Sequence, residues 1–296
     1  ELEAAMSVHA LKAAGRFGER RIHDASAERR SLVVGRLSTP ALIAPKYFYD
    51  AKGCALFTAI CELPEYYPTR TEAAIFERHR GEIVAAAGTG KQLVDLGAGD
   101  CRKAASWLPF LAPWRYVAVD IAQDALARAL SQLATLHPDI DMRGVLADFA
   151  GGLDLSHDIG EGATTFFYPG SSIGNFPPVV ATRFLHTIRR HCGNDGASGL
   201  LIGVDTRKDV ARLTAAYDDA AGVTAAFNRN ALVHVNRVLG TRFVPDAFAH
   251  VAFYDEARSP VDVHLGALTA QTIPRDGPSR PFPAGPPPPH AYLGPH

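Results

Sequence analysis

The middle of the chain alternates between short apolar runs and longer stretches of helical composition. The apolar runs are Gln92 to Leu96, Tyr116 to Val119, Thr164 to Tyr168 and Gly199 to Val204. The helical stretches are Cys101 to Leu111, Gln123 to Leu136 and Val179 to Cys192. This alternation is typical of βαβ units, in which helices cover both faces of a parallel sheet. The pattern therefore predicts an α/β fold with a doubly wound, mostly parallel sheet.

The residues before this region follow a different pattern. The first forty residues mix charged residues and Ala without a strong period, and residues 47–70 are rich in aromatics and punctuated by Pro. Ala55 to Leu63 is predicted to form a short helix, because a helix seldom continues through the residue before a proline. Thr71 to Ala87 has helical composition and ends at a glycine, so a second helix is expected there.

The residues after the apolar runs predict a second, smaller domain. Val210 to Leu239 is a long Ala-rich amphipathic stretch. Phe248 to Asp255 and Val261 to Leu265 have the alternation of two strands in a hairpin. Pro274 to His296 is dense in proline, which cannot occupy a helix interior or a central strand, so we expect a loose tail.

Composition and charge exclude several classes of protein. Lys and Arg number 30 against 31 Asp and Glu, which leaves no broad basic field for a nucleic-acid backbone and favours a small-molecule substrate. The four cysteines form no CxxC pair and have no His at ligand spacing, so neither a metal site nor a disulfide framework is predicted. No apolar run approaches the roughly 18 residues of a membrane span, and Glu1 to Ala10 lacks the order of a signal peptide. We expect a cytoplasmic monomer.

The segment QLVDLGAGDCRK carries the sharpest local motif. It leads an apolar run into a turn with Gly97 and Gly99, whose backbone can pass close to a ligand. Asp120 follows the next run and is placed to accept hydrogen bonds from the two ribose hydroxyls of an adenosine ligand. Asp148 and Phe149 follow GVLA and could hold and cover an adenine ring. Each feature alone also fits an ordinary turn or strand end, but the ordered set is more specific.

The same turn distinguishes between cofactors. A dinucleotide fingerprint requires a third glycine, because the pyrophosphate lies over the helix end. Arg102 occupies that position, and Asp100 adds a negative charge beside it. The turn therefore suits a ligand without phosphates, S-adenosylmethionine, better than NAD.

Longer segments extend the pattern beyond a nucleotide-binding turn. They read KYFYDAKGCALFTAICELPEYYPTRTEAAIF, LVDLGAGDCRK, FFYPGSSIGNF and AYDDAAGVTAAFNRNALVHVNRVLGTRF. Over roughly residues 20 to 272 the chain closely resembles the histidine-specific N-α-methyltransferases, which make the trimethylated histidine of ergothioneine biosynthesis. The resemblance implies S-adenosylmethionine as cofactor. It also implies an N-terminal segment (1–70) contributing to the substrate and cofactor cleft, a Rossmann-like domain (71–205), a substrate-binding second domain (206–273) and a Pro-rich tail (274–296).

The resemblance also assigns roles to individual residues. The implied cofactor-binding residues are Tyr66, Gly97, Lys103, Asp120, Asp148 and Phe149. The implied substrate-binding residues are Tyr49, Tyr66, Gly170, Asn175, Tyr217 and Val263, with Asn175 and Tyr49 as the catalytic pair. Tyrosine hydroxyls and an Asn amide can hold a zwitterion while leaving the nitrogen lone pair free. Aromatic packing or turn formation would also explain them. No His or Glu stands out as a base, so alignment of the amine is expected to account for most of the rate.

The chain departs from the family pattern at Val263 and in its C-terminal segment. Histidine-specific members place a Met where VDVHL has Val263, and they end with a Glu and a Ser that bind the substrate imidazole. The corresponding segment here, FPAGPPPPHAYLGPH, contains neither residue type. Losing buried polar partners relaxes selection for the matching group, so a relaxed aromatic specificity is one alternative. Another is that the Pro-rich end is an artefact on an ordinary histidine enzyme.

Three further alternatives belong to other classes. A nicotinamide dehydrogenase is disfavoured by Arg102 at the third-glycine position. A non-catalytic ligand-binding relative would fit the divergent C-terminal segment. A methyltransferase acting on protein or nucleic acid is disfavoured by the neutral charge and by a set of polar residues suited to a small zwitterion.

Overall fold

The computed structural model describes residues 17–22, 25–39, 41–148, 152–194, 196–254, 261–275 and 277–285. The chain divides into two compact units, which are described separately. Among the described residues the first unit contains 17–22, 70–148, 152–173, 177–194 and 196–205. The second contains 25–39, 41–69, 174–176, 206–254, 261–275 and 277–285.

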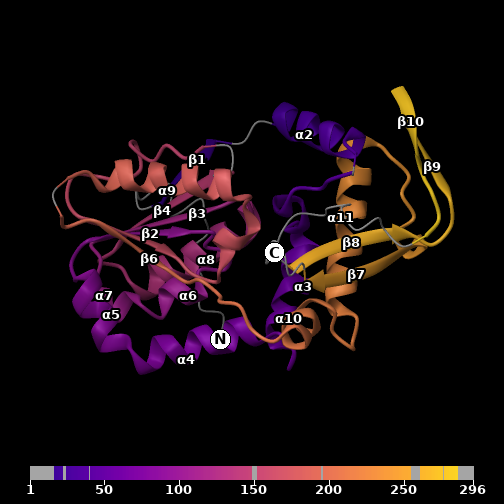
Figure 1. The fold of residues 1–296 in the computed structure, drawn as a ribbon. Helices are drawn as coiled ribbons and strands as arrows, with labels where there is room; N and C mark the ends of the chain where they lie inside the picture. Colours follow the sequence, from indigo (N-terminus) through magenta and orange to yellow (C-terminus); the bar gives the residue numbers. More distant parts are fainter. Residues whose placement is uncertain are drawn as a thin grey trace, which may run out of the picture. The chain divides into compact units, whose positions relative to one another are not determined.

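A parallel sheet forms the centre of the first unit. Within the described residues it has six strands in the order β1-β4-β3-β2-β5-β6, and every pairing is parallel (Figure 1). The strands are β1 (Phe17–Ile22), β2 (Gln92–Leu96), β3 (Arg115–Asp120), β4 (Asp141–Ala147), β5 (Thr164–Tyr168) and β6 (Gly199–Ile202). After β2 the chain adds β3 and β4 on one side and then β5 and β6 on the other. The order therefore reverses between β2 and β5, the kind of switch point where open α/β sheets bind ligands.

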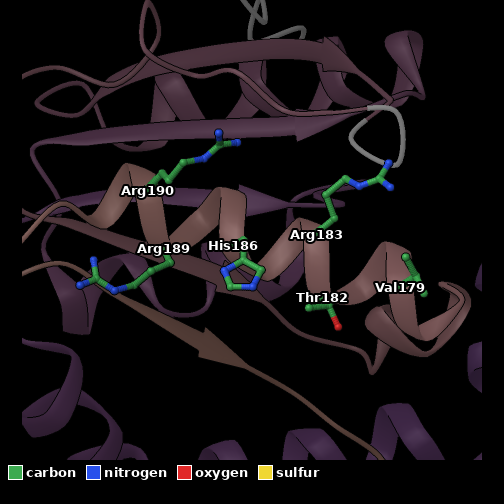
Figure 2. Close-up of a pocket in the computed structure, with 6 residues that line it drawn as sticks. All are labelled: Val179, Thr182, Arg183, His186, Arg189 and Arg190. Carbon is green, nitrogen blue, oxygen red and sulfur yellow. The ribbon is translucent and has the colours of Figure 1, made fainter.

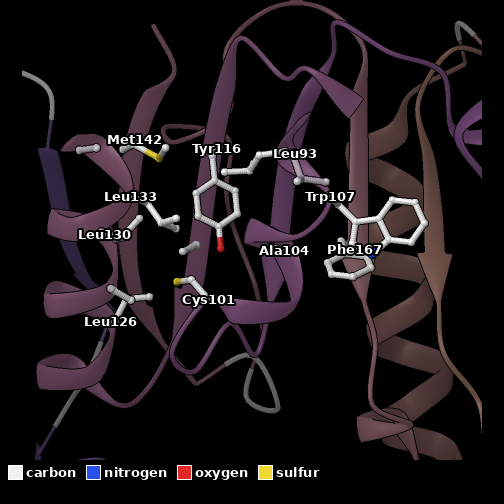
Figure 3. Close-up of a cluster of buried hydrophobic side chains, with 14 of the residues drawn as sticks. Leu93, Cys101, Ala104, Trp107, Tyr116, Leu126, Leu130, Leu133, Met142 and Phe167 are labelled. Carbon is white, nitrogen blue, oxygen red and sulfur yellow. The ribbon is translucent and has the colours of Figure 1, made fainter. Parts of the chain in front are cut away.

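Helices cover both faces of this sheet. On one face, Leu126 and Leu130 of α8 (Gln123–Leu136) are fully buried and point toward Tyr116 of the sheet (Figure 3). On the other, Tyr168 packs against Phe184 of α9 (Pro178–Cys192), with ring centroids 5.1 Å apart. Consecutive strand residues point to opposite faces, which is why both faces need an apolar cover. The predicted doubly wound α/β fold is confirmed.

Two predicted helices are interrupted. Thr71 to Ala87 was expected to be one helix, and Cys101 to Leu111 another. In the structure both segments are divided, into α4 (Tyr67–Arg78) and α5 (Arg80–Ala87), and into α6 (Arg102–Ala105) and α7 (Leu108–Leu111). The second interruption has a physical cause. Pro109 has no N–H, so it is tolerated in the first turn of a helix but not in its interior, and a new helix, α7, therefore begins just before it.

A long helix organises the second unit. Helix α11 (Val223–Leu239) packs against α2 (Ala25–Leu37), η1 (Pro45–Phe48), α3 (Ala51–Glu62) and β7 (Phe248–Tyr254). The amphipathic stretch from Val210 is divided into α10 (Val210–Tyr217) and α11, because the Asp219 carboxylate accepts hydrogen bonds from the first N–H groups of α11. The predicted hairpin is confirmed, since β7 pairs antiparallel with β8 (Val261–Ala267).

The Pro-rich end corrects the expectation of a loose tail from residue 274. Strands β9 (Gln271–Arg275) and β10 (Gly277–Phe282) form a two-stranded antiparallel sheet. A two-stranded sheet has only edge strands, where prolines without an N–H are tolerated. Phe282 packs against Phe243 and Phe248, with ring centroids 5.4 and 6.3 Å away, which fixes the end of the hairpin. The rest of the expected tail, residues 286–296, lies outside the described residues.

The described residues of the N-terminal segment are divided between the two units. Strand β1 lies at the edge of the parallel sheet beside β4, whereas α2, η1 and α3 belong to the second unit. Neither β1 nor α2 was predicted, because this part of the sequence has no apolar period. The short helix expected from Ala55 is present as α3, which begins at Ala51 after the Asp50 carboxylate caps its first turn.

Candidate functional site

Four predicted site residues of the first unit follow the carboxyl ends of neighbouring strands. Gly97 follows β2, Asp120 ends β3, Asp148 follows β4, and Gly170 comes two residues after β5. Because these strands are parallel and adjacent, their carboxyl ends lie at the same edge of the sheet. The structure therefore brings these residues to the switch-point edge, where an open α/β sheet can bind a ligand.

The glycine turn has the backbone shape that requires glycine. Gly97 has φ 73° and Gly99 has φ 54°, both in the left-handed region. The Gly97 N–H donates to the Val119 carbonyl of β3 at 2.9 Å, which ties the turn to the neighbouring strand. A Cβ placed on Gly99 would meet nothing within 4 Å, so the turn leaves open space beside its backbone.

Asp120 is held at this edge by two backbone donors. Its Oδ2 accepts from the Gly99 N–H at 2.7 Å and its Oδ1 from the Ala122 N–H at 2.8 Å. Burial raises the pKa of this carboxyl, and the backbone hydrogen bonds oppose that shift. Each carboxylate oxygen has a second lone pair, so the side chain keeps the capacity to accept hydrogen bonds from a diol.

Lys103 and Gly170 share a partner that the sequence did not indicate. The Glu72 carboxylate lies 2.6 Å from Lys103 Nζ and accepts a 2.5 Å hydrogen bond from the Gly170 N–H. Glu72 belongs to α4, far from both partners in sequence. Its only sequence signal was its place in PTRTEAAIF, within the longest of the segments on which the family resemblance rests.

The second unit gathers the predicted aromatic residues into one cluster. Tyr49, Tyr66, Tyr217 and Val263 all contribute to the same apolar core. Tyr66 packs edge-on against Tyr217 at 6.0 Å, and Tyr49 packs against Phe57 at 5.5 Å. Tyr217 lies far from Tyr49 and Tyr66 in the sequence, so it is the fold that brings it to them.

The surroundings of Tyr66 favour a neutral phenol at that position. Burial is the main cause that raises the pKa of Tyr66 well above its ordinary value, and the electrostatic effect of the nearby Tyr217 adds to the shift. Tyr66 therefore stays protonated near neutral pH and can donate a hydrogen bond, but it does not serve readily as a proton acceptor.

His250 fixes the backbone beside Tyr217. Its Nε2 lies 2.8 Å from the Tyr217 carbonyl and its Nδ1 lies 3.0 Å from the Asn228 side-chain amide. Burial lowers the pKa of His250, which favours a neutral ring that donates from Nε2 and accepts at Nδ1. Sequence reasoning did not identify this residue.

Two other predicted residues are placed less fully. Asn175 ends the 3-10 helix η3 (Ser172–Asn175) after β5, is partly buried, and is grouped with the second unit through residues 174–176. Phe149, predicted to cover an adenine ring, lies outside the described residues.

Comparison with known proteins decides the family. The model of the family described as histidine-specific methyltransferase, SAM-dependent, matches residues 29–285. The chain belongs to this family. The histidine N-alpha-methyltransferase of Mycolicibacterium smegmatis is 40% identical over 253 residues, which cover 84% of this chain and 77% of that protein. The protein of the same name from Mycobacterium tuberculosis is 38% identical, covering 83% and 76%. Ergothioneine biosynthesis protein 1 of Neurospora crassa is 31% identical over 69% of this chain and 24% of that protein.

As a member of the SAM-dependent histidine-specific methyltransferases, the protein is a methyltransferase that uses S-adenosylmethionine. The residues at the switch-point edge fit this cofactor. Open space lies beside Gly99, and Asp120 offers a carboxylate for a ribose diol. Arg102 at the third-glycine position leaves the turn without the feature that a pyrophosphate would require.

A surface hollow on α9 lies apart from these residues. Figure 2 shows the six side chains that line it, Val179, Thr182, Arg183, His186, Arg189 and Arg190. Arg189 donates to the Gly193 carbonyl and Arg190 to Thr187 Oγ1, so two of the cations are held by the end of their own helix. None of the predicted site residues lines this hollow.

The helices of the described residues include none that is both long and apolar enough to cross a membrane.

Proposed function

We propose that this methyltransferase transfers methyl groups from S-adenosylmethionine to the α-amino nitrogen of free L-histidine, and that three successive transfers give N,N,N-trimethylhistidine, the first step of ergothioneine biosynthesis. The observation that carries the proposal is the 40% identity over 84% of the chain to a histidine N-alpha-methyltransferase. The tyrosine cluster of the second unit supports it, because phenol hydroxyls suit a small zwitterion.

The proposed chemistry asks little of the protein beyond alignment. When bound, the cofactor's sulfonium supplies an already activated methyl group. The protein has to hold an uncharged amine in line with that methyl, and alignment of this kind can supply most of the rate. We assign this positioning to Asn175, Tyr49 and Tyr217. The raised pKa of Tyr66 argues against that residue as the base, so the amine's proton passes to water or to another acceptor.

A screen of the twenty amino acids tests substrate and product together. The protein is incubated with S-adenosylmethionine and each amino acid in turn, and products are read by mass spectrometry as gains of one, two or three methyl groups. Histidine gaining three methyl groups is the expected result. A protein that binds S-adenosylhomocysteine but methylates none of the twenty would contradict the proposal.

Asn175→Ala is expected to separate substrate from cofactor binding. Removing one amide that holds the amino acid should raise KM for histidine and lower kcat/KM by about tenfold or more, while the Kd for S-adenosylhomocysteine changes by less than about twofold. Steady-state kinetics and calorimetry measure the two effects. Asn194→Ala is the matched control, since Asn194 is exposed and its side-chain oxygen accepts a hydrogen bond from Arg189. Equal losses for both ligands would make Asn175 a structural residue.

A relaxed aromatic specificity is the second candidate, favoured by two features. Val263 is fully buried in the cluster that contains Tyr66, where the resemblance implies a larger Met. Residues 282–296 contain neither a Glu nor a Ser that could bind an imidazole.

We therefore expect this chain to select histidine less strongly than its mycobacterial relative. The ratio of kcat/KM for histidine to that for phenylalanine or tryptophan should be at least about tenfold lower than in the Mycolicibacterium smegmatis enzyme assayed side by side. Val263→Met should recover part of the preference by refilling the pocket. Equal or tighter selection of histidine by this chain would show that the ring is recognised through Tyr66 and its neighbours alone.

A further inference from the structure

One carboxylate connects a predicted cofactor residue to a predicted substrate residue in the first unit. Glu72 Oε2 pairs with Lys103 Nζ at 2.6 Å, and Glu72 Oε1 accepts from the Gly170 N–H at 2.5 Å. The Glu72 side chain is only 14% exposed, whereas that of Lys103 is 41% exposed. The carboxylate is thus the anchored member of the pair, and the lysine is the one that reaches outward.

The surrounding backbone leaves room for this carboxylate. A Cβ at Gly203 would overlap Glu72 Oε1, so the glycine allows the carboxylate to lie against the backbone after β6. A Cβ at Gly170 would come within 3.0 Å of Lys103 Nζ. Two glycines therefore provide the space in which Glu72 and Lys103 meet the turn after β5.

That turn has a conformation that needs support. Gly170 has φ 79° and Ser171 has φ 57°, and a non-glycine residue in the left-handed region is costly unless its surroundings hold it. Ser171 Oγ accepts from the Asp205 N–H at 2.9 Å, and Glu72 holds the Gly170 N–H on the other side. The turn is therefore fixed by one side chain from α4 and by one backbone group after β6.

We propose that Glu72 is a positioning residue that orients Lys103 toward the cofactor and fixes the Gly170 turn for the amino acid. The assignment rests on the proposed function for its amino-acid half only. The proposal that Glu72 orients Lys103 toward the cofactor depends only on the Glu72–Lys103 pair and on S-adenosylmethionine as the cofactor. Glu72 itself touches neither reactant and acts through the two residues that it holds.

Two substitutions separate these effects. In Glu72→Gln an amide oxygen can still accept from the fixed Gly170 N–H, but Lys103 loses its anionic partner. We expect the calorimetric Kd for S-adenosylhomocysteine to rise about tenfold, with KM for the amino acid within about twofold of the wild type. Glu72→Ala removes both contacts, so both quantities should rise. Glu77→Gln is the matched control, because Glu77 lies on the same helix and is exposed.

A double-mutant cycle gives the decisive readout. In a Lys103→Met background, Glu72→Gln should change the Kd for S-adenosylhomocysteine by less than about twofold, because the residue through which it acts has gone. Additive losses, or an unchanged Kd in Glu72→Gln alone, would overturn the proposal. If Glu72→Ala fails to fold, the Gln variant and the cycle still decide. The calorimetric titrations use S-adenosylhomocysteine with no amino acid present, so a wild type inactive on histidine would refute the proposed function and leave this test intact.

Discussion

Asp120→Ala is expected to weaken binding of S-adenosylmethionine by about 2 kcal/mol or more, close to a thirtyfold rise in Kd. The reason is that one carboxylate at the end of β3 would accept hydrogen bonds from both ribose hydroxyls. The substitution removes these two charge-assisted hydrogen bonds together. The same substitution releases the Gly99 and Ala122 N–H groups that the carboxylate now holds. Isothermal titration calorimetry with S-adenosylhomocysteine measures the effect directly.

A second acid in the same turn provides the control. Asp100 pairs with Arg102 at 2.5 Å and its side chain is 51% exposed. Asp100→Ala therefore removes a negative charge from the turn without touching the buried edge of the sheet, and its cofactor affinity should stay close to that of the wild type. Unchanged affinity in Asp120→Ala, or equal losses in both variants, would contradict the ribose assignment. Thermal unfolding of each variant shows whether the turn itself has been loosened.

The strands of the central sheet were predictable because of where they lie. Residues of β2 (QLVDL) and β5 (TTFFY) are buried along their whole length, so each appears as a short run in which apolar residues predominate. Strand β1 has the sequence FGERRI and lies at the sheet edge beside β4 alone. Backbone hydrogen bonds to β4, which is distant in the sequence, fix the position of β1. Such bonds do not require an apolar period in the sequence of β1. Local patterning therefore could not reveal it.

The interrupted helices illustrate a second limit. The Ala-rich composition of Val210 to Leu239 favours helix over most of its length, and one continuous amphipathic stretch was predicted. The break comes from Asp219, whose carboxylate caps α11, and from Gly222 with φ 70°. A capping residue surrounded by good helix formers is recognisable only after the start of the next helix is known.

The candidate site residues that lie at the carboxyl ends of strands could be predicted from the sequence. Asp120 and Gly97 each follow an apolar run, and parallel strands bring such positions to one edge of the sheet. Glu72 was not predictable in this way, since its partners lie 31 and 98 positions further along the chain. Nothing in the local sequence distinguishes it from an exposed helix glutamate such as Glu77, and only the folded chain shows the difference.

Asp95 is a second buried acid whose role emerges only from the fold. It lies in β2, is 2% exposed, and accepts a 2.7 Å hydrogen bond from the Tyr116 hydroxyl. Burial raises its pKa to about 7; the Tyr116 hydrogen bond and Lys103 oppose the shift, and the charges of Asp120 and Asp100 add to it. The chain therefore keeps a carboxyl that titrates near neutral pH two residues before the glycine turn.

The stability of the protein should fall as pH rises from about 4 to about 7. In that window the folded state keeps a proton on Asp95 that the unfolded state has released, so raising the pH favours unfolding, by about 4 kcal/mol in total from this group. Asp95→Asn removes the titration and should flatten the decline by that amount. The remaining pH dependence combines Asp120, whose raised pKa gives a slope of the same sign, with His250, whose lowered pKa gives a slope of the opposite sign. Urea unfolding at pH values from 4.5 to 8 measures how the free energy of unfolding changes with pH. A pH-independent loss of stability caused by the substitution does not alter this slope. Asp100→Asn, in the exposed part of the turn, is the matched control. A pH dependence in Asp95→Asn as steep as in the wild type would mean that Asp95 ionises inside the fold as easily as it does in water.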